Sequence, residues 1–314
     1  MNEKSVKFAK MHGLGNDFII IPLNQMQNFD LSPGKVKRLC HRRMGIGADG
    51  ILVLKSRSSS EIEDNTGFDL TIFNSDGSRA SMCGNGVRCA AHYLKKQGMI
   101  EEKVNLHTDA GRVVPEIINI EQENKAIIRA NIGCPVFFPD LIPVKEKFLE
   151  VVSENPGGKE KCRESPPEIK FYHIPNLNKN IRACIVSMGN PHAVLFTSKS
   201  LNNIPLKSWG SYIENHKAFP KKTNVEFARI EDRKNIKLKV WERGAGLTLA
   251  CGTGAAAAAA AAIKKGYTEE FVNVHLPGGK LAVDWNSENI YIEGPSRLVF
   301  TGKINTIPRV SISE

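Results

Sequence analysis

The sequence predicts an α+β protein made of two pseudo-symmetric lobes, each a mixed, mostly antiparallel sheet wrapped around a central helix. Two observations predict this fold. A helix start containing Cys-Gly-x-Gly occurs twice, and the segments around the two copies match each other. The strand-like segments are also short and do not alternate with helices, which is typical of α+β lobes rather than of a doubly wound βαβ array.

A run of eight alanines, 255–262, predicts the second central helix. Alanine has the highest helix propensity, and Lys264 and Lys265 stand where the negative end of a helix favours positive charge. Gly266 is then the expected left-handed stop. Because this helix lacks bulky side chains, we expect it to lie in a crowded interior, with other elements packed close on every side.

The helix start Cys251-Gly252-Thr253-Gly254 has a counterpart 168 residues earlier, Cys83-Gly84-Asn85-Gly86. The strand-like segment before each start and the strand and turn after each helix match at the same offset without a gap. An internal duplication explains this better than a chance match of two glycine-rich helices. The other aligned positions are Lys96 with Lys264, Gly98 with Gly266, 68–73 with 236–241, 104–107 with 272–275 and 111–112 with 279–280.

The remaining elements follow from hydrophobic periodicity and turn residues. Ser32 is expected to cap a basic helix from Pro33 to Arg43. We expect the N-terminal lobe to span 1–127, with 299–314 returning to it, and the C-terminal lobe to span 128–298. Strands are predicted at 6–11, 17–21, 51–54, 104–107, 112–118, 126–131, 183–187, 193–196 and 223–227.

Two segments are predicted to be surface excursions. Residues 56–66 are a polar loop, and residues 143–170 are rich in lysine, proline and glycine. We interpret the longer segment as a solvated excursion of unknown role, partly helical around 147–152.

The composition narrows the functional class. Of the 314 residues, 41% are hydrophobic and 24% charged, which is typical of a soluble protein with material for two cores. The net charge of +10 comes from scattered lysines, and aromatic residues are only 7%, so a basic surface or an anionic metabolite is favoured over nucleic acid. No apolar signal core or membrane span is evident, which predicts a cytoplasmic protein.

The seven cysteines lack metal-ligand spacing and contain no CxxC pair, so we expect reduced thiols and no metal. Cys83 and Cys251 each precede a helix start, where free N–H groups bind anions and lower the pKa of a thiol. Two like lobes facing across a cleft would bring these thiols to opposite faces of one carbon, to remove a proton and return another. The alternatives are two buried structural cysteines, a redox pair and a thiol hydrolase.

Seven segments, taken together and in order, resemble the diaminopimelate epimerase family. They are 11–18, 73–78, 82–86, 188–192, 223–226, 241–244 and 250–254. The resemblance implies an isomerase that converts LL- to meso-diaminopimelate without PLP or another cofactor, a step in lysine and peptidoglycan precursor synthesis. It also implies a homodimer. Proline and hydroxyproline racemases carry a similar Cys-Gly-Thr-Gly segment and are the alternative.

The resemblance also implies the site residues. Cys83 and Cys251 match the family's two catalytic acid/base thiols, and His192 and Glu242 match the polar pair that tunes the reacting centre. Some members carry Gln at the position of Gly50, which cannot make that side-chain contact. The matched substrate-binding positions are Asn16, Asn74, Gly84, Asn85, Asn190, Asn224, Glu242, Arg243, Gly252 and Thr253.

Overall fold

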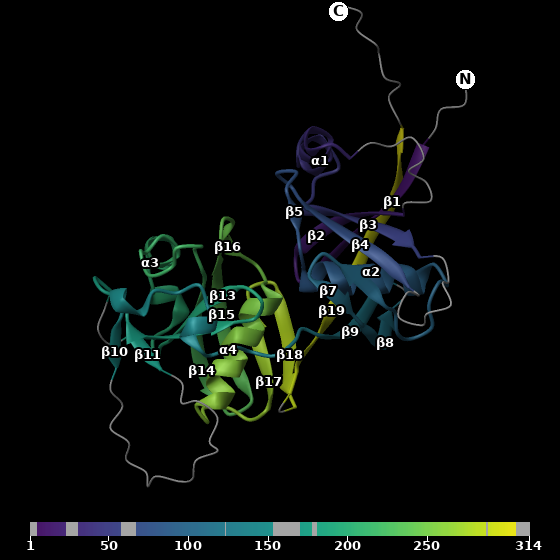
Figure 1. The fold of residues 1–314 in the computed structure, drawn as a ribbon. Coiled ribbons are helices and arrows are strands. Elements are labelled where there is room, and N and C mark those ends of the chain that lie inside the picture. The colour runs from purple at the N-terminus through teal and green to yellow at the C-terminus, as the bar shows by residue number, and fades with distance from the viewer. Residues whose placement is uncertain are drawn as a thin grey trace, which may run out of the picture. The chain divides into compact units, whose positions relative to one another are not determined.

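The computed structural model divides into two compact units (Figure 1). Unit 1 is Met1–Ala130 with Gly294–Glu314, and unit 2 is Asn131–Glu293. The limits expected from the sequence were 1–127 with 299–314, and 128–298. The structure describes residues 5–22, 31–57, 67–122, 124–152, 170–177, 181–286 and 288–305.

Unit 1 contains two helices, α1 (Pro33–Cys40) and α2 (Gly84–Lys96), among its described residues. Its strands pair in the order β8-β9-β19-β1-β2-β3-β4-β6-β7, and β5 pairs with the free end of β4. Their bounds are β1 Ser5–Gly13, β2 Asn16–Pro22, β3 Gly50–Ser56, β4 Phe68–Asn74, β5 Arg79–Ala80, β6 Leu106–Thr108, β7 Gly111–Val113, β8 Glu116–Gln122, β9 Lys125–Asn131 and β19 Ile290–Asn305.

Unit 2 contains α3 (Leu206–Glu214) and α4 (Gly252–Lys264), with the short 3-10 helices η3 (Pro139–Leu141), η4 (Glu146–Phe148) and η5 (Leu201–Asn203). Its strands pair in the order β10 to β15, then β17, β18 and the first part of β19, with β16 on β15. Their bounds are β10 Glu150–Val152, β11 Phe171–His173, β12 Arg182–Ser187, β13 Pro191–Phe196, β14 Asn224–Asp232, β15 Asn235–Glu242, β16 Gly246–Thr248, β17 Phe271–Leu276 and β18 Gly279–Trp285.

The pairing pattern of the two units is the same. From β1 to β7 and from β12 to β18, successive pairs along the sheet run antiparallel, parallel, antiparallel, parallel and antiparallel. The register agrees as well: Phe68 pairs with Leu106 in unit 1, and Ile236 pairs with Val274 in unit 2. Both partners are displaced by the offset found in the sequence, so the structure confirms the α+β fold and the duplication.

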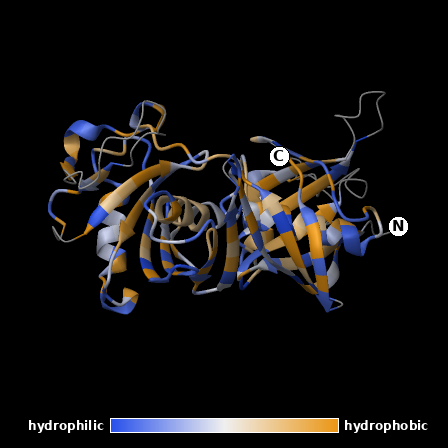
Figure 2. Ribbon diagram, turned by 90° about the horizontal axis from the view of Figure 1, so that it is seen from below, coloured by the Kyte–Doolittle hydropathy of each residue, from blue (hydrophilic) through white to orange (hydrophobic). Residues whose placement is uncertain are grey.

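Each unit wraps its sheet around its central helix. In unit 2, α4 contacts strands β12, β13, β14, β15, β17 and β18, and all eight alanines of 255–262 are 0% exposed. Figure 2 shows this apolar helix enclosed by strands that alternate between hydrophobic and hydrophilic residues. In unit 1, α2 contacts β1, β2, β3 and β8. An alanine helix suits this enclosure because its small side chains let backbones approach closely.

The two central helices end in the same way. Gly98 has φ +67° and Gly266 has φ +70°, the left-handed region in which glycine is favoured. The next residue in each case donates its N–H back across the last turn, from Met99 to Leu94 O at 3.0 Å and from Tyr267 to Ala262 O at 2.9 Å. The predicted stop at Gly266 is therefore confirmed.

Helix α1 differs from its prediction. It ends at Cys40 rather than at Arg43, and the side chain of Ser32 makes no capping hydrogen bond. The chain turns because Leu39 O accepts the N–H groups of Ile46 at 2.9 Å and Gly47 at 3.0 Å. These bonds use a carbonyl that a longer helix would need for its own next turn.

Two other expectations were wrong. The single strand expected at 112–118 is two strands, β7 and β8, with Pro115 between them, a residue that cannot donate to a ladder. The helix expected around 147–152 is the short η4 followed by β10, because pairing with β11 favours an extended chain there. Residues 58–66, 153–169 and 306–314 lie outside the described residues. In the part of the chain that the structure describes, no helix is long and apolar enough to cross a membrane.

Because the two central helices end in the same way, alanine at either terminal glycine should have the same effect on stability. Gly98→Ala and Gly266→Ala should each lower the free energy of unfolding by about 1 kcal/mol, because an L side chain is strained at positive φ although nothing lies within 4 Å of the new Cβ. Gly34→Ala in α1 also meets nothing within 4 Å but has no positive φ, so it should stabilise instead, by up to about 1 kcal/mol. Urea unfolding of the three variants measures this. Equal effects at all three positions would contradict it.

Candidate active site

Each central helix begins at a cysteine whose sulfur caps it. Cys83 Sγ accepts the N–H of Gly86 at 3.4 Å, and Cys251 Sγ accepts the N–H of Gly254 at 3.4 Å. Both cysteines have the extended backbone of an N-cap residue. The remaining N–H groups of the first turn are free of intrahelical partners in any helix. Each unit therefore combines a thiol with anion-binding backbone donors.

The Cys251 thiol is a weaker acid than the sequence suggested. Burial raises its pKa well above the usual range, and the charges of Glu242 and Glu226 raise it further. Hydrogen bonds from Thr253 and from the backbone of Gly254 act in the opposite direction but are smaller. The expectation that a helix start lowers the thiol pKa is thus wrong for Cys251, because loss of solvent and two nearby carboxyls outweigh the helix end.

In unit 1, Asn16 is fixed next to Cys83. Asn16 Nδ2 donates to Asp49 Oδ2 at 3.0 Å, and Asn16 Oδ1 accepts from Asn85 Nδ2 at 3.0 Å. The Cys83 sulfur lies 3.8 Å from the same Oδ1, a long and weak contact. Asn16, Cys83, Gly84 and Asn85 therefore lie together at the start of α2.

A compact network of charges holds Asn16 in place. Arg42 bridges Asp17 at 2.8 Å and Asp49 at 2.7 Å, and buried Lys10 pairs with Asp17 at 2.6 Å. Burial would raise the pKa of Asp17, but the hydrogen bonds and charges of Arg42 and Lys10 outweigh it and lower that pKa to about 2. The sequence analysis assigned none of these four residues to the site.

Asn74 lies at the end of β4, where its Nδ2 donates to Ser78 Oγ at 2.9 Å. The strand register aligns it with Gly50 and, one strand further, with Phe18. A Cβ at Gly50 would lie 2.4 Å from Phe73 O, so this backbone has no room for a side chain there. No hydrogen bond joins Asn74 to the Cys83 group among the described residues, and its role stays a prediction.

In unit 2, His192 is completely buried and bonded through both ring nitrogens. Its Nε2 lies 2.9 Å from Asn190 Oδ1, and its Nδ1 lies 2.8 Å from Glu226 Oε1. His192 and Glu226 are both 0% exposed. The sequence analysis identified Asn190 and His192 but gave Glu226 no role.

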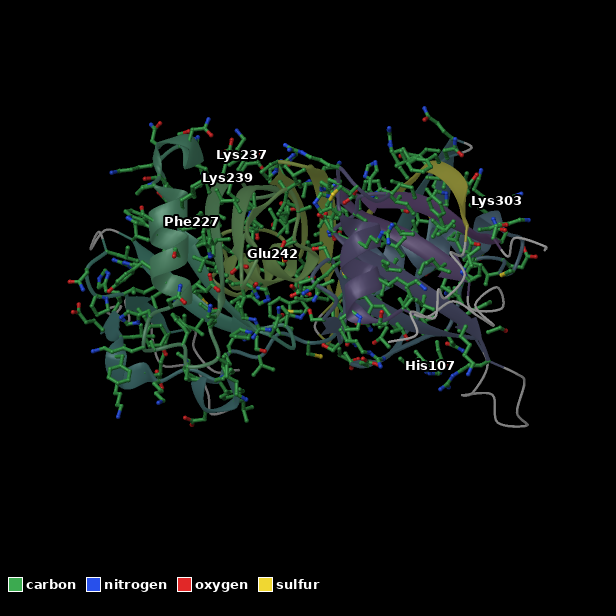
Figure 3. The ribbon with its side chains drawn as sticks, turned by 90° about the horizontal axis from the view of Figure 1, so that it is seen from above. His107, Phe227, Lys237, Lys239, Glu242 and Lys303 are labelled. Atoms are coloured by element: carbon green, nitrogen blue, oxygen red, sulfur yellow. The ribbon has the colours of Figure 1, made fainter. Side chains whose placement is uncertain are left out.

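Asn224, Glu242 and Arg243 lie together at the end of β15, where Figure 3 labels Glu242. Asn224 Oδ1 accepts the backbone N–H of Arg243 at 2.9 Å, so Asn224 holds the start of the turn after β15. Glu214 of α3 holds the rest, since it accepts from Gly244 N at 3.0 Å and from Trp241 Nε1 at 2.8 Å. The Arg243 guanidinium is exposed and donates to Lys221 O at 3.2 Å.

The duplication aligns two buried polar residues with apolar ones. His192 pairs with Asn224 across parallel strands as Phe18 pairs with Gly50, so His192 occupies the position of Phe18. Two residues further along the second strand of each pair, Glu226 occupies the position of Leu52.

The glycines Gly86 and Gly254, in the first turns of the two central helices, provide an independent check of where Leu52 and Glu226 lie. A Cβ on Gly254 would lie 2.8 Å from Glu226 Oε1 and 3.3 Å from Cys251 Sγ. A Cβ on Gly86 would lie 3.1 Å from Leu52 Cδ2. Glu226 thus lies beneath the first turn of α4, beside the sulfur. No sequence pattern identified Glu226, because a glutamate between two apolar residues of a strand is expected on the exposed face.

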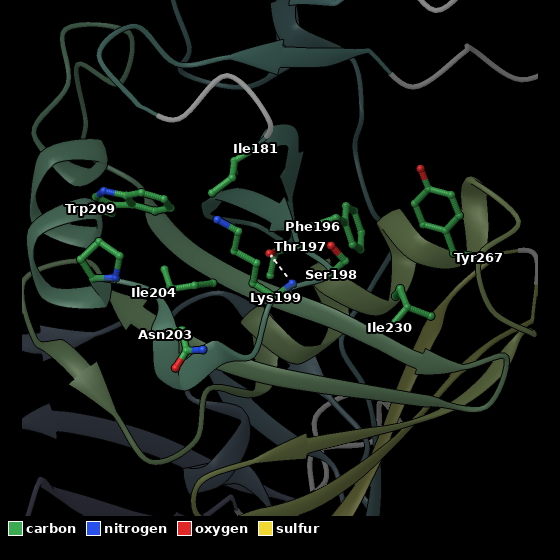
Figure 4. A pocket seen from close by; sticks show the side chains of 11 residues that line it. Ile181, Phe196, Thr197, Ser198, Lys199, Asn203, Ile204, Trp209, Ile230 and Tyr267 are labelled. Carbon is green, nitrogen blue, oxygen red and sulfur yellow. Dashed lines mark hydrogen bonds between the residues drawn. The ribbon is translucent and has the colours of Figure 1, made fainter.

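Two cavities of unit 2 lie apart from the cysteine groups. One of about 550 Å³ is lined by Phe196, Lys199, Trp209 and Tyr267 among others (Figure 4). A second, of about 680 Å³, is lined by η4 and α3 residues including Phe148 and Tyr212. None of the candidate site residues lines either cavity. Within the described ranges, no group of three or more His, Cys, Asp or Glu side chains could hold a metal ion.

Comparisons with known proteins identify relatives of this chain. A family model described as diaminopimelate epimerase matches residues 8–138 and 184–299. The diaminopimelate epimerase of Halothermothrix orenii is 41% identical over 301 residues, covering 95% of this chain and 98% of that protein. That of Carboxydothermus hydrogenoformans is 41% identical over 306 residues, covering 95% and 99%.

Solved structures share the fold at low identity. A hydroxyproline epimerase from Agrobacterium vitis with bound trans-4-hydroxy-L-proline is 14% identical with a TM-score of 0.61, over 96% of this chain and 91% of that one. A Bacillus anthracis phenazine biosynthesis protein of the PhzF family is 14% identical with a TM-score of 0.62, over 96% and 99%. At this identity the likeness shows the fold alone.

The two helix-start glycines should respond differently to alanine. Gly254→Ala should lower the free energy of unfolding by about 1–3 kcal/mol, because its Cβ would meet a buried, hydrogen-bonded carboxyl group. Gly86→Ala should cost less, because the methyl end of Leu52 can rotate away. Denaturant unfolding of both variants measures the difference, and a larger loss for Gly86→Ala would contradict the placement of Glu226.

Proposed function

Because this chain belongs to the diaminopimelate epimerase family, a family of isomerases, we propose that it converts LL-2,6-diaminopimelate into meso-diaminopimelate with Cys83 and Cys251 as its two acid/base groups. One observation carries the residue assignment. Both cysteines cap duplicated helices with the same sulfur-to-amide distance of 3.4 Å, so each unit supplies one thiol at an anion-binding helix start.

The proposed reaction is a two-base inversion. A thiolate removes the proton from the α-carbon, and the negative charge passes to the α-carbon and its carboxylate. The other thiol then donates its proton to the opposite face. The first cysteine ends as a thiol and the second as a thiolate, so protons and charge balance. Both transfers use side chains of this chain, and we propose that no cofactor takes part.

The remaining matched residues are proposed to bind the substrate and support the charge. We assign the backbone N–H groups of Gly84, Asn85, Gly252 and Thr253, at the two helix starts, to a carboxylate of the substrate. We assign the amides Asn16, Asn74, Asn190 and Asn224 to the ammonium and carboxylate groups, and Arg243 to the distant carboxylate, which a guanidinium binds in two places. His192 and Glu242 would tune the two thiols. The contacts of Asn16 with Cys83 and of Asn190 with His192 support this assignment.

Other thiol functions fit less well. A redox protein would require a disulfide for turnover, whereas the proposed inversion uses both cysteines in the reduced form. A thiol hydrolase needs one nucleophile with a histidine base and leaves the second cysteine unexplained. A proline or hydroxyproline racemase shares only the fold with this chain, at 14% identity.

We further propose that the protein is a cytoplasmic homodimer in lysine and peptidoglycan precursor synthesis. Family membership supports the location and the pathway. Exposed apolar side chains on β8 (Ile118, Ile120) and β19 (Val299, Phe300), the strands on either side of β9, support a contact with a second copy.

Charge at β19 should then weaken the dimer. Val299→Lys should raise the dissociation constant at least about tenfold, because a charge would have to be desolvated in an apolar contact. Leu141→Lys makes the same kind of change at an exposed leucine of unit 2 and should have no effect. Sedimentation equilibrium measures both. A monomeric wild-type protein would refute the dimer.

The cysteine roles predict a specific loss of activity. Cys83→Ala and Cys251→Ala should each lower epimerisation by about 10²- to 10⁴-fold or more, because inversion needs a proton donor on each face. Each variant should retain α-proton exchange with solvent for at most one stereoisomer, and the two should prefer opposite ones. Exchange of LL- and meso-diaminopimelate in deuterated water, without added PLP, measures this.

Cys134→Ala is the matched control, since Cys134 is an exposed thiol outside both helix starts, and it should keep wild-type activity. The same assay with proline or alanine tests the substrate class. These should exchange about 10⁴-fold more slowly, because the polar groups for the distant end would stay unpaired. Near-wild-type epimerisation by either cysteine variant would refute the mechanism, and comparable turnover of proline would favour the racemase.

A further inference from the structure

The two thiols of the proposed mechanism have different charged surroundings. Glu226 Oε1 and Cys251 Sγ both lie within 3.3 Å of the position that a Cβ on Gly254 would occupy. The carboxyl group and the sulfur are therefore close neighbours beneath the first turn of α4. Glu226 Oε2 is buried and has no hydrogen-bond partner among the described residues.

Glu226 and His192 share a hydrogen bond in the buried interior of unit 2. With Asn190 Oδ1 accepting from Nε2 of His192, its Nδ1 either donates to a Glu226 carboxylate or accepts from a Glu226 carboxyl. Burial raises the pKa of Glu226, and the charge and hydrogen bond of His192 act against that rise.

Neighbouring buried acids cannot all be ionised at the same pH. The groups that face Cys251 from the surrounding strands are Glu226 of β14, paired with His192 of β13, and Glu242 of β15. A carboxyl is intrinsically a stronger acid than a thiol by about 4 pKa units. The negative charge in this part of unit 2 therefore goes to the carboxyls first, and the proton stays on Cys251.

Unit 1 has the opposite arrangement at the matching positions. Leu52 replaces Glu226, and fully buried Arg88 stands where unit 2 has Ala256, at the duplication offset. Arg88 donates to Gly84 O at 3.3 Å and to Asn85 Oδ1, and it has no carboxylate partner among the described residues.

A negative sulfur at Cys83 would balance this cation. Burial lowers the pKa of Arg88, and negative charge on Cys89 or Cys83 opposes that effect. Burial raises the pKa of Cys89 to about 12, so Cys83 is the thiol left to supply the charge. Asn16 Oδ1 lies 3.8 Å from the Cys83 sulfur.

We propose that Glu226 is a positioning residue that keeps Cys251 protonated, so that the free protein starts turnover with Cys83 as thiolate base and Cys251 as thiol acid. This assignment of roles rests on the proposed two-base function, but the charge states themselves do not. After one inversion the charges are exchanged, with the thiolate at Cys251 beside the carboxyls. Solvent then returns a proton to Cys251 and removes one from Cys83, which restores the starting form.

The pH dependence of alkylation tests the proposal on the reduced, full-length protein. Iodoacetamide reacts with thiolates, and the pH midpoint of labelling reports ionisation, whereas access to the thiol changes only the rate. Trypsin separates the two sites, because residues 80–88 contain only Cys83 and residues 244–264 only Cys251. In the wild-type protein, we expect the midpoint of Cys83 to lie at least about one pH unit below that of Cys251.

Glu226→Gln should lower the Cys251 midpoint by about one pH unit, which is about tenfold faster labelling at a fixed pH below it. The Cys83 midpoint in the same samples should not move. Glu231→Gln is the matched control, because it removes a carboxylate from the exposed end of the same strand, where Glu231 pairs with Lys237 at 2.8 Å. This variant should leave both midpoints unchanged.

Glu226→Leu provides a second test, since it reproduces the Leu52 arrangement of unit 1 and should shift the Cys251 midpoint in the same direction. An unchanged Cys251 midpoint in the folded Gln or Leu variant would overturn the proposal, and so would a wild-type Cys83 midpoint above that of Cys251. Neither result would affect the proposed function. That function fails on the epimerisation assay of the cysteine variants, whatever the labelling shows.

Discussion

The hydrogen bond from the third residue of each central helix to the cysteine sulfur is the interaction on which both units depend. It ends the extended chain, starts the helix and places a thiol beside free backbone donors in a single step. The enclosing sheet then needs a helix with small side chains, which the run of eight alanines supplies in unit 2. The position of the chemistry and the packing of the core are therefore set by the same few residues.

The two units differ in the charged residues that they bury at matching positions. Burying an ionised group costs several kcal/mol, and even a buried pair often gains no more than it loses, so a buried Glu226, His192 or Arg88 does little for folding alone. Their counterparts in the other unit are Leu52, Phe18 and Ala256, which show that the frame accepts apolar residues at these positions. This cost is easier to understand if the charges serve a reaction in which one sulfur must be ionised and the other protonated.

The sequence was sufficient for features that depend on local pattern. The alanine run, the glycine stop at Gly266 and the matched cysteines each follow from residue type and spacing, and the structure agrees with them. Features that depend on distant partners were missed. The early end of α1 depends on carbonyl bonds across a turn, and the roles of Glu226 and Asp49 depend on residues about 30 positions away. The strand pattern does not show that Glu226 is buried, because a polar residue between two apolar ones is expected on the exposed face of a strand.

Gly254 connects the start of helix α4 with the buried carboxyl group beneath it. Alanine there would favour the helix by up to about 1 kcal/mol and would only lengthen the run that follows. The chain retains a residue that weakens its own helix because a Cβ would occupy the space of the Glu226 carboxyl. The nearest atom to a Cβ on Gly86 would be a methyl carbon of Leu52 at 3.1 Å, so its constraint is milder although its place in the helix is the same. The stricter requirement therefore follows the buried carboxyl rather than the helix start, and Gly254 and Glu226 constrain each other.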